Sequence, residues 1–253
     1  RRYISALGAA EHFTGEGISP ELIPPNGVLL AAGYYKLRAW KDEALLALLK
    51  EAQRRDCRAV LNVCISRDGE ADPQRCLRLL PWVHVFVPNE DEARMLTGER
   101  EPRAQARVLR EAGAQAVVIT RGPRGLYAEQ GSRVVEMDAF RVPVVDPSGC
   151  GDCFTAGLIV GLLRQWDLEH TLKFASAVGA LGATALGCTS GVPSFAEVER
   201  FLKQNSPPVG IAPLLDRGTI EACHLPFEEK APFPGQRIPP PAGTLRTTSA
   251  ETP

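Results

Sequence analysis

The sequence predicts an α/β fold in which a mostly parallel β-sheet is covered by helices. Between Val28 and Val145, short apolar runs alternate with amphipathic stretches, which is the order that a parallel sheet with helical connections produces. The chain has 253 residues, of which 44% are hydrophobic and 23% charged, so it can bury one large core or two modest ones. These proportions exclude a disordered protein.

Strands and helices are expected in turn along the first half of the chain. The expected strands are short runs rich in Val, Leu, Ile and Ala, at 28–33, 59–65 and 83–87. A helix is expected at 42–55, where four leucines would share an inner face, and a shorter helix at 73–80. The carboxyl ends of the strands would therefore meet along one edge of the sheet.

The second half continues this order and then changes to helices alone. A helix at 103–112 leads into a strand at 116–120, and two shorter β segments follow at 125–128 and 133–137. A strand ending at Val145 enters a glycine-rich segment. The helices expected after that segment lie at 153–164, 168–186 and 194–204.

The proline content rises sharply beyond Asn205, and the periodicity is lost. The sequence therefore predicts a domain at 1–205 and a proline-rich, disordered tail at 206–253.

Composition narrows the classes of partner and compartment. The formal net charge of −1 argues against nucleic acid or an anionic membrane as partner. The longest apolar runs are too short to span a bilayer, and the first residues do not follow the pattern of a secretory signal. Seven cysteines at irregular spacings favour a reducing compartment. We therefore expect a cytoplasmic protein that binds a small molecule.

The segment D-P-S-G-C-G-D at 146–152 is the strongest candidate for a functional site. A strand, two glycines and a helix start would present backbone N–H groups to an anion. Asp152 would place a carboxylate beside these N–H groups. Phosphoryl transfer requires such a carboxylate to orient the attacking hydroxyl. The same residues also suit a plain turn with Asp152 as the helix cap. A P-loop is excluded because no Lys follows Gly151.

A dithiol oxidoreductase is a second interpretation of this segment. Cys150 and Cys153 form a C-x-x-C pair at a helix start, where a thiolate is stabilised. On local grounds this hypothesis stays open beside the anion site.

Three further segments accompany the glycine-rich one, in a fixed order. They are P-N-E-D-E with Asn89 and Glu92, T-R-G-P-R-G with Thr120, Gly122 and Gly125, and the small-residue stretch 174–193. Together the four segments resemble those of the ribokinase (PfkB) family of carbohydrate kinases. Taken alone, Asn89 and Glu92 would be a helix cap and its partner, and 120–125 a simple turn.

The resemblance implies a ribokinase-like three-layer fold and a role for each of these residues. Asp152 would be the catalytic base, and the amides of Gly149, Cys150 and Gly151 would form the anion hole. The binding site for ATP would be lined by Thr120, Gly122, Gly125, Ser176 and Gly179. Asn89 and Glu92 would hold Mg²⁺. Asp146 and Ser148 fall where many family members bind an activating monovalent cation such as K⁺.

The resemblance covers only the C-terminal two thirds of the family's length. The N-terminal strands, the sugar-binding Asp and most of the β lid are therefore expected to be absent, and Arg2 and Tyr3 are candidates for contact with the sugar. The resemblance implies ATP-dependent phosphorylation of a hydroxymethyl group on a sugar or sugar acid, with a homodimer formed through the lid of the full-length protein. We expect little activity from this chain alone. The alternative is a non-catalytic nucleotide-binding remnant of such a kinase.

Overall fold

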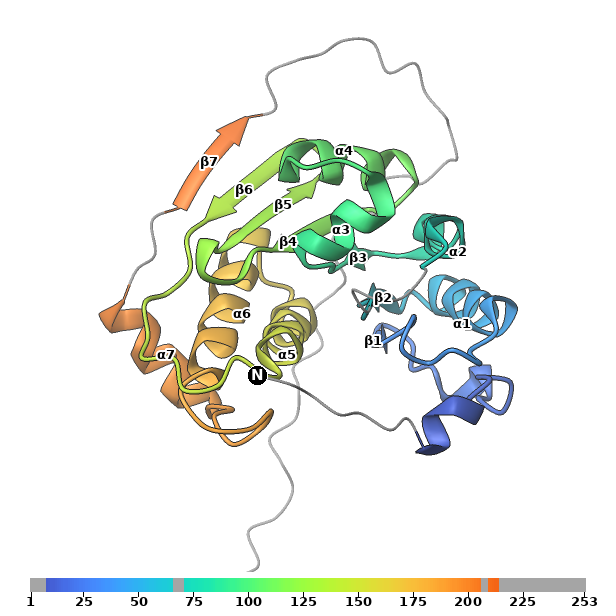
Figure 1. Ribbon diagram of the computed structural model, residues 1–253, viewed down its shortest axis with the longest axis horizontal. Coiled ribbons are helices and arrows are strands. Elements are labelled where there is room, and N and C mark those ends of the chain that lie inside the picture. The colour runs from blue at the N-terminus through green and yellow to red at the C-terminus, as the bar shows by residue number, and fades with distance from the viewer. Residues whose placement is uncertain (1–7, 66–70, 206–208, 214–253) are drawn as a thin grey trace, which may run out of the picture. The chain divides into compact units, whose positions relative to one another are not determined.

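A twisted sheet of seven strands, in the order β1 to β7, runs through the part of the chain that the structure describes (Figure 1). The structure is a computed structural model that describes residues 8–65, 71–205 and 209–213. The candidate sugar contacts Arg2 and Tyr3 lie outside these residues, as does most of the predicted tail.

The first four strands are parallel, and the last three form an antiparallel meander. The parallel strands are β1 (Val28–Ala31), β2 (Arg58–Leu61), β3 (Val85–Phe86) and β4 (Ala116–Thr120). The meander consists of β5 (Leu126–Gln130), β6 (Arg133–Met137) and β7 (Val209–Pro213). Because β5 reverses the direction of β4 and β6 reverses it again, β6 runs with the parallel strands. The expected mostly parallel α/β sheet is confirmed.

Among the described residues, helices connect the parallel strands, and three further helices lie between β6 and β7 in the chain. Those in the first half are α1 (Asp42–Arg54), α2 (Pro73–Leu77), α3 (Glu90–Thr97) and α4 (Pro102–Glu111). Those in the second half are α5 (Cys150–Leu163), α6 (Leu168–Gly182) and α7 (Phe195–Gln204). Short 3₁₀ turns lie at Gly8–His12, Pro20–Leu22, Leu80–Trp82 and Gly122–Arg124. No helix in the described ranges is long and apolar enough to cross a membrane.

Successive residues of the strands β2 to β5 belong to two different cores, one on each face of the sheet. On one face, Leu61, Phe86, Val117 and Ile119 pack with buried residues of α1, α2, α3 and α4. On the other face, Val60, Val85, Val118 and Ala128 pack with Phe154 and Leu158 of α5 and Leu172 and Ala175 of α6. This alternation follows from the two-residue period of a strand. It produces three layers, with helices on both faces of the sheet (Figure 1).

Helices α5 and α6 approach each other closely because glycines face α6. A β-carbon on Gly157 would lie 2.7 Å from the α-carbon of Ala175, and one on Gly161 would lie 2.5 Å from a methyl carbon of Thr171. Larger side chains at these two positions would push the helices apart. The pair therefore fixes where the N-terminal turn of α5 lies.

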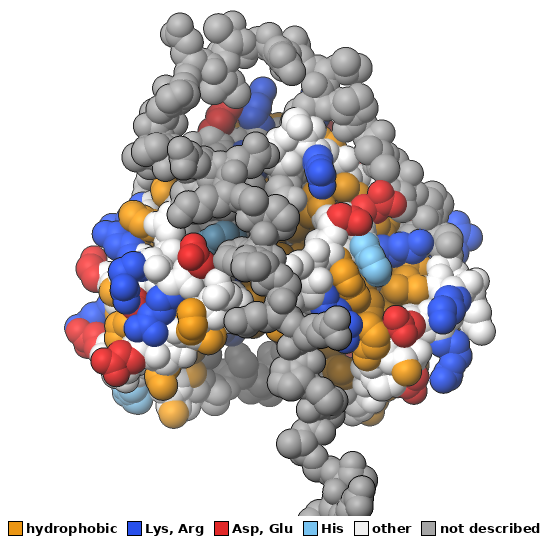
Figure 2. Space-filling view, turned by 180° about the vertical axis from the view of Figure 1, so that it is seen from behind, with side chains coloured by type: hydrophobic (Ala, Val, Ile, Leu, Met, Phe, Trp, Pro, Cys, Tyr) orange, Lys and Arg blue, Asp and Glu red, His pale blue; other side chains and the backbone are white. Residues whose placement is uncertain are grey.

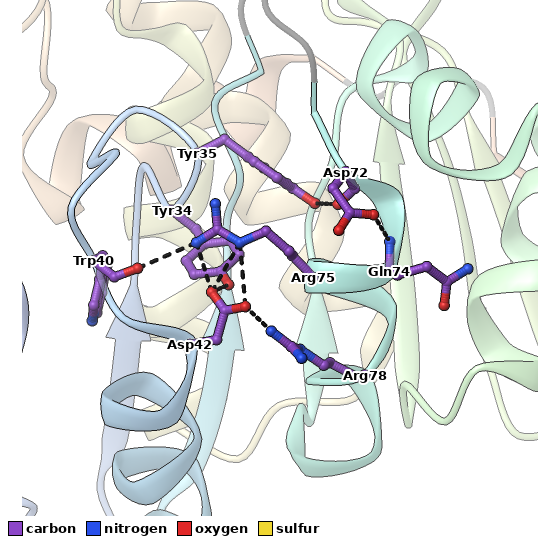
Figure 3. Close-up of polar contacts among 8 residues, drawn as sticks. All are labelled: Tyr34, Tyr35, Trp40, Asp42, Asp72, Gln74, Arg75 and Arg78. Carbon is purple, nitrogen blue, oxygen red and sulfur yellow. Dashed lines mark hydrogen bonds and ion pairs between the residues drawn. The ribbon is translucent and has the colours of Figure 1, made fainter.

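Asp42 joins α1 to α2 through a cluster of hydrogen bonds and ion pairs (Figure 3). Its carboxylate accepts from Arg75 Nη2 at 2.6 Å, from Arg78 and from the Tyr34 hydroxyl. Arg75 also donates to the Trp40 carbonyl at 3.2 Å and lies over the Tyr34 ring. Burial raises the pKa of Asp42, but these hydrogen bonds outweigh burial and hold the pKa at about 2.

The structure corrects the expected strand that ends at Val145. Residues 138–149 form no strand, and Val144 and Val145 are 63% and 49% exposed. The backbone N–H groups of Val145 and Asp146 both donate to the carbonyl of Ala183, at 2.8 and 3.1 Å. Pro143 has no N–H to give to a ladder, so an apolar run here does not pair as a strand.

The expected helix boundaries also change. Helix α5 begins at Cys150 rather than Cys153, and α6 ends at Gly182 rather than 186. β7 pairs with β6 from Val209 to Pro213, inside the segment expected as tail, and the division of the chain at 205 and 206 stays a prediction. Its backbone hydrogen bonds add to the edge of the sheet without needing an apolar pattern that the sequence would reveal.

Candidate active site

The glycine-rich segment forms a tight turn that leads directly into α5. Gly149 has φ of +77° and is the residue before the first helical position. A β-carbon on Gly149 would lie 2.7 Å from the carbonyl oxygen of Cys188, so both the conformation and the space require glycine. The amide of Cys150 donates to the Pro147 carbonyl at 3.3 Å, and that of Cys153 donates to Gly149 at 2.9 Å.

The first turn of α5 therefore contains Cys150, Gly151 and Asp152. The N–H groups at these positions have no partner one turn back within the helix, and the helix dipole adds positive potential there. The Cys150 amide already serves the turn, so Gly151 and Asp152 are better placed to donate to an anion. The Asp152 amide was not among the expected donors, because the helix was expected to begin three residues later.

Asp152 lies at the third position of α5 with its side chain exposed. It does not cap the helix, since Gly149 occupies the cap position and no side chain bonds there. The interpretation of Asp152 as a plain helix cap is therefore wrong. Its carboxylate is available to a ligand beside the free amides of the same turn.

Asn62 fixes this turn to the end of β2, and sequence reasoning missed it. Its side-chain amide donates to the hydroxyl of Thr155 at 3.2 Å, and that hydroxyl donates to the Gly151 carbonyl at 2.9 Å. Thr155 is 2% exposed, so both bonds are shielded from water. The position of Asn62 directly after the apolar run 59–61 was the available indication.

Cys64 lies near the charges of the site. Burial raises its pKa, Glu92 and Asp152 raise it further, and Lys36 lowers it. Because Glu92, Asp152 and Lys36 all affect the pKa of Cys64, these side chains lie near it, at the carboxyl edge of the sheet. Neither Cys64 nor Lys36 was singled out as a site residue, because neither lies in one of the four segments.

Asn89 and Glu92 form a capping box at the start of α3. The Glu92 amide donates to Asn89 Oδ1 at 2.9 Å, and the Asn89 amide donates to Glu92 Oε2 at 2.8 Å. Glu92 also accepts from the Ile65 amide at 3.3 Å and is 7% exposed. Burial raises the pKa of Glu92 to about 7, although hydrogen bonds from Asn89 and Ile65 oppose this. The predicted capping role is confirmed, and the magnesium role stays a prediction.

Asn89 and Glu92 could bind Mg²⁺ only together with other ligands. Within the described ranges, no group of three or more His, Cys, Asp and Glu side chains is arranged to hold a metal ion. Mg²⁺ commonly takes one or two carboxylates and completes its shell with waters and substrate phosphates. The exposed Asn89 and the nearby Glu92 are compatible with that incomplete kind of site.

Thr120 brings the end of β4 beside Asn89. The Thr120 amide donates to the Pro88 carbonyl at 3.0 Å, and Thr120 and Asn89 form an isolated parallel bridge. Gly122 has φ of +56° and is exposed, whereas Gly125 has φ of +80° and packs against the chain at Met137 and Asp138. The turn expected at 120–125 is present, and its contact with a nucleotide stays a prediction.

Asp146 ties the glycine-rich turn to the loop after α6. Its Oδ1 accepts from the Ser148 amide at 3.1 Å and from the Ser148 hydroxyl at 2.8 Å. Its Oδ2 accepts from the Gly187 amide at 3.1 Å, and the residue is 7% exposed. The structure thus joins Asp146 and Ser148, the two residues expected at a cation site, to the loop at Gly187. The cation itself stays a prediction.

Ser176 and Gly179, which are expected to line the nucleotide, lie on α6 behind the glycine-rich turn. Gly179 is buried, and a β-carbon there would be 3.2 Å from the Cys150 carbonyl. Ser176 lies one turn earlier and is half-buried. Gly179 makes room for the first turn of α5, and direct contact of Ser176 or Gly179 with a nucleotide stays a prediction.

The thiols of Cys150 and Cys153 do not have the character of a redox enzyme. Burial raises the pKa of both, and neighbouring acidic groups raise it further. Reactive dithiols instead have a lowered pKa, which maintains a thiolate at neutral pH. Cys153 is also buried, at 5% exposure. These features disfavour the dithiol oxidoreductase.

The arrangement of layers and strands defines the class of fold as ribokinase-like. Aminoimidazole riboside kinase from Salmonella enterica matches 74% of this chain with a TM-score of 0.64 and 25% identity, and the match covers 67% of that protein. Ribokinase from Thermotoga maritima matches 77% with a TM-score of 0.64 and 23% identity, and the match covers 63% of that protein.

The chain belongs to the pfkB family of carbohydrate kinases, whose family model matches residues 6–194. Ribokinase of Haemophilus influenzae is 29% identical over 130 residues, which are 49% of this chain and 42% of that relative. The 2-dehydro-3-deoxygluconokinase of Thermoproteus tenax is 31% identical over 186 residues, 73% of this chain and 56% of that relative. The chain spans about half the length of these two relatives, and the resemblance stated from the four segments is confirmed.

Proposed function

We propose that the protein carrying this chain transfers the γ-phosphoryl group of ATP to a hydroxymethyl group of a sugar or sugar acid. One observation carries the proposal: the exposed carboxylate of Asp152 lies in the same helical turn as the N–H groups of Gly151 and Asp152. A proton acceptor and an anion site are the two protein groups that phosphoryl transfer most needs. Family membership supports this choice over other anion-binding functions.

In this reaction Asp152 accepts the proton of the acceptor hydroxyl as its oxygen attacks the γ-phosphorus. The bond between that phosphorus and the bridging oxygen breaks, and ADP leaves. The amides of the first turn of α5 stabilise the negative charge on the transferring group. The turn keeps its position through Asn62, Thr155 and Asp146, so these donors need little rearrangement when the substrate binds.

The remaining predicted contacts surround this turn. Asn89 and Glu92 would hold Mg²⁺, which neutralises charge on the phosphates when it is bound. Asp146 and Ser148, with the loop at Gly187, would hold a monovalent cation such as K⁺. ATP would lie along Thr120, Gly122, Gly125, Ser176 and Gly179. Sugar acids are included as acceptors because the relative that matches 73% of this chain is named for one.

The test uses the protein that carries this chain and compares wild type with Asp152→Asn. ATP turnover is measured with neutral sugars and with sugar acids as acceptors, and ATP binding is measured in parallel. We expect turnover to fall roughly 10²- to 10⁴-fold, the usual contribution of a positioned base. ATP binding should change only a few-fold. Asp167→Asn is the matched control, since Asp167 is exposed and caps α6 by accepting from His170 at 2.8 Å. Equal turnover by wild type and Asp152→Asn would reject the proposed base.

A non-catalytic nucleotide-binding remnant is the second candidate, favoured by the partial match of the chain to its relatives. It would bind ATP and show no turnover with any acceptor, and Asp152→Asn would leave its ATP binding unchanged. Turnover by the 253-residue chain itself would exclude it.

A further inference from the structure

Three cysteine thiols converge on the N-terminal turn of α5. Cys150 and Cys153 belong to that turn, and Cys188 comes from the loop after α6. The thiol of Cys153 lies 3.8 Å from the Cys188 carbonyl oxygen. A β-carbon on Gly149 would lie 2.9 Å from both the α-carbon and the β-carbon of Cys188. The loop at Cys188 therefore packs directly on the turn.

Cys150 and Cys188 lie on two segments that are in direct contact. Cys188 is in contact with Gly149, and Cys150 is the next residue, about 3.8 Å further along the chain. Disulfides join residues whose α-carbons are roughly 4.4–6.8 Å apart, so two cysteines on touching segments are candidates for such a bond.

Exposure distinguishes the three thiols. Cys188 is exposed, Cys150 is half-buried and Cys153 is 5% exposed. An oxidant in solution therefore reaches Cys188 first, and Cys150 is the more accessible partner on α5. All three are free thiols in this structure.

We propose that Cys188 and Cys150 are a modification site, at which oxidation by a hydroperoxide forms a reversible disulfide across the anion site. The hydroperoxide oxidises the Cys188 thiol to a sulfenic acid and is reduced to an alcohol, or to water in the case of hydrogen peroxide. The Cys150 thiolate then attacks that sulfur, the S–S bond forms, and hydroxide leaves and takes up the thiol proton as water. A dithiol reductant reverses the step by thiol–disulfide exchange.

The disulfide would act where the phosphate is expected to bind. It would tie the loop at 187–188 across the first turn of α5, next to the amides of Gly151 and Asp152. It would also strain the hydrogen bond from the Gly187 amide to Asp146, which now holds this loop in place. Oxidation should therefore weaken nucleotide binding. The consequence for turnover rests on the proposed function, whereas the disulfide and the binding change do not.

The test treats the protein with hydrogen peroxide and identifies the bond by mass spectrometry of non-reduced peptides. Fragment ions must separate Cys150 from Cys153, and binding of a fluorescent ATP analogue is measured before oxidation, after it and after dithiothreitol. We expect a Cys150–Cys188 crosslink, an affinity at least tenfold lower, and full recovery on reduction. Absence of that crosslink, or unchanged affinity in crosslinked protein, would overturn the proposal.

Two variants keep the test specific. Cys188→Ser should form no crosslink and retain its own affinity for the analogue after peroxide treatment. Cys64→Ser is the matched control, because Cys64 is an exposed thiol near Asp152 that lies outside the cluster. It should respond as wild type does. Loss of affinity in oxidised Cys188→Ser, or protection by Cys64→Ser, would assign the effect to other thiols and reject the proposed pair. These readouts hold even if no kinase turnover is found.

Discussion

The side-chain amide of Asn62 donates to the Thr155 hydroxyl at 3.2 Å and thereby joins the end of β2 to the first turn of α5. The same hydroxyl donates to the carbonyl of Gly151 at 2.9 Å. A continuous path of hydrogen bonds thus runs from the sheet to the residue whose amide is expected to meet the phosphate. The buried Thr155 is the central group of this path.

Replacement of Thr155 by valine should separate this path from simple packing. Valine has nearly the same shape but removes the hydroxyl that the half-buried Asn62 amide donates to, which costs about 1 kcal/mol. We expect Thr155→Val to lower the free energy of unfolding by that amount. Because the turn is then less firmly positioned, turnover should fall by about tenfold or more.

Thr155→Ser is the matched control, since it keeps the hydroxyl and loses only a methyl group. Denaturant unfolding and ATP turnover are measured for both variants. If Thr155→Ser loses as much turnover as Thr155→Val, the hydroxyl does not position the turn and packing alone explains the effect.

The two glycines of the turn after β4 should respond very differently to alanine. Gly125 has φ of +80°, and a β-carbon there would overlap the carbonyl oxygen of Met137 and lie 2.7 Å from the carbonyl carbon of Asp138. Since these are backbone atoms of β6 and the residue after it, they cannot move without disturbing the sheet. We expect Gly125→Ala to destabilise the fold by about 3 kcal/mol or more, by the combined cost of strain and overlap.

Gly122→Ala tests the same change where only the backbone conformation opposes it. Gly122 has φ of +56°, but no atom lies within 4 Å of a β-carbon at this position. A non-glycine residue in this left-handed region costs roughly 1 to 2 kcal/mol. Thermal or denaturant unfolding of both variants checks the difference, and equal destabilisation would contradict the role of the overlap.

The sequence predicted those parts of the fold that local pattern determines. The strand at Ala116–Thr120 and the helix at Asp42–Arg54 lie within one residue of the expected positions, because each is a continuous pattern with one period. The prediction of a strand ending at Val145 was wrong, because pairing with a neighbouring strand depends on the whole sheet and not on a local apolar run. β7 was missed for the same reason, since its pairing is made by backbone groups.

The site divides in the same way. Asp152, Gly149 and Gly151 were found because they stand together in the sequence. Asn62 and Thr155 are 93 residues apart and come together only through the packing of α5 on the sheet. No local pattern could have joined them.

Asp146 should be important for nucleotide binding because its carboxylate holds the loop at Gly187 beside the glycine-rich turn. In Asp146→Asn, the amide nitrogen of the new side chain would face the Gly187 N–H or the Ser148 donors, so one hydrogen bond becomes a contact between two donors. We expect ATP affinity to fall about tenfold, which corresponds to about 1.4 kcal/mol. Asp138→Asn is the control, because Asp138 is an exposed acid earlier in the same connection. Calorimetric titration with ATP measures both, and equal affinities for the two variants would contradict the role of Asp146.

The Asp42 cluster should make stability depend on acid in a defined range of pH. The pKa of Asp42 is held at about 2 in the folded chain, against 3.8 for the ordinary carboxyl group. As the pH falls below 3.8, the unfolded chain therefore takes up a proton that folded Asp42 still resists. The stabilisation is complete above pH 3.8 and is lost as the pH falls toward 2, by about 2 kcal/mol at most.

Asp42→Asn has no carboxyl group to titrate, so the gap in the free energy of unfolding between wild type and this variant should narrow by about 1.5 kcal/mol between pH 5 and pH 2.5. Urea unfolding at a series of pH values measures that gap. Glu43→Gln is the control, because Glu43 is the next residue of α1 and is exposed. It shows how much of any change comes from the loss of an acid in the same turn of α1. A constant gap for Asp42→Asn would mean that Arg75, Arg78 and Tyr34 do not hold the carboxylate in its charged form, and that the link between α1 and α2 depends on packing instead.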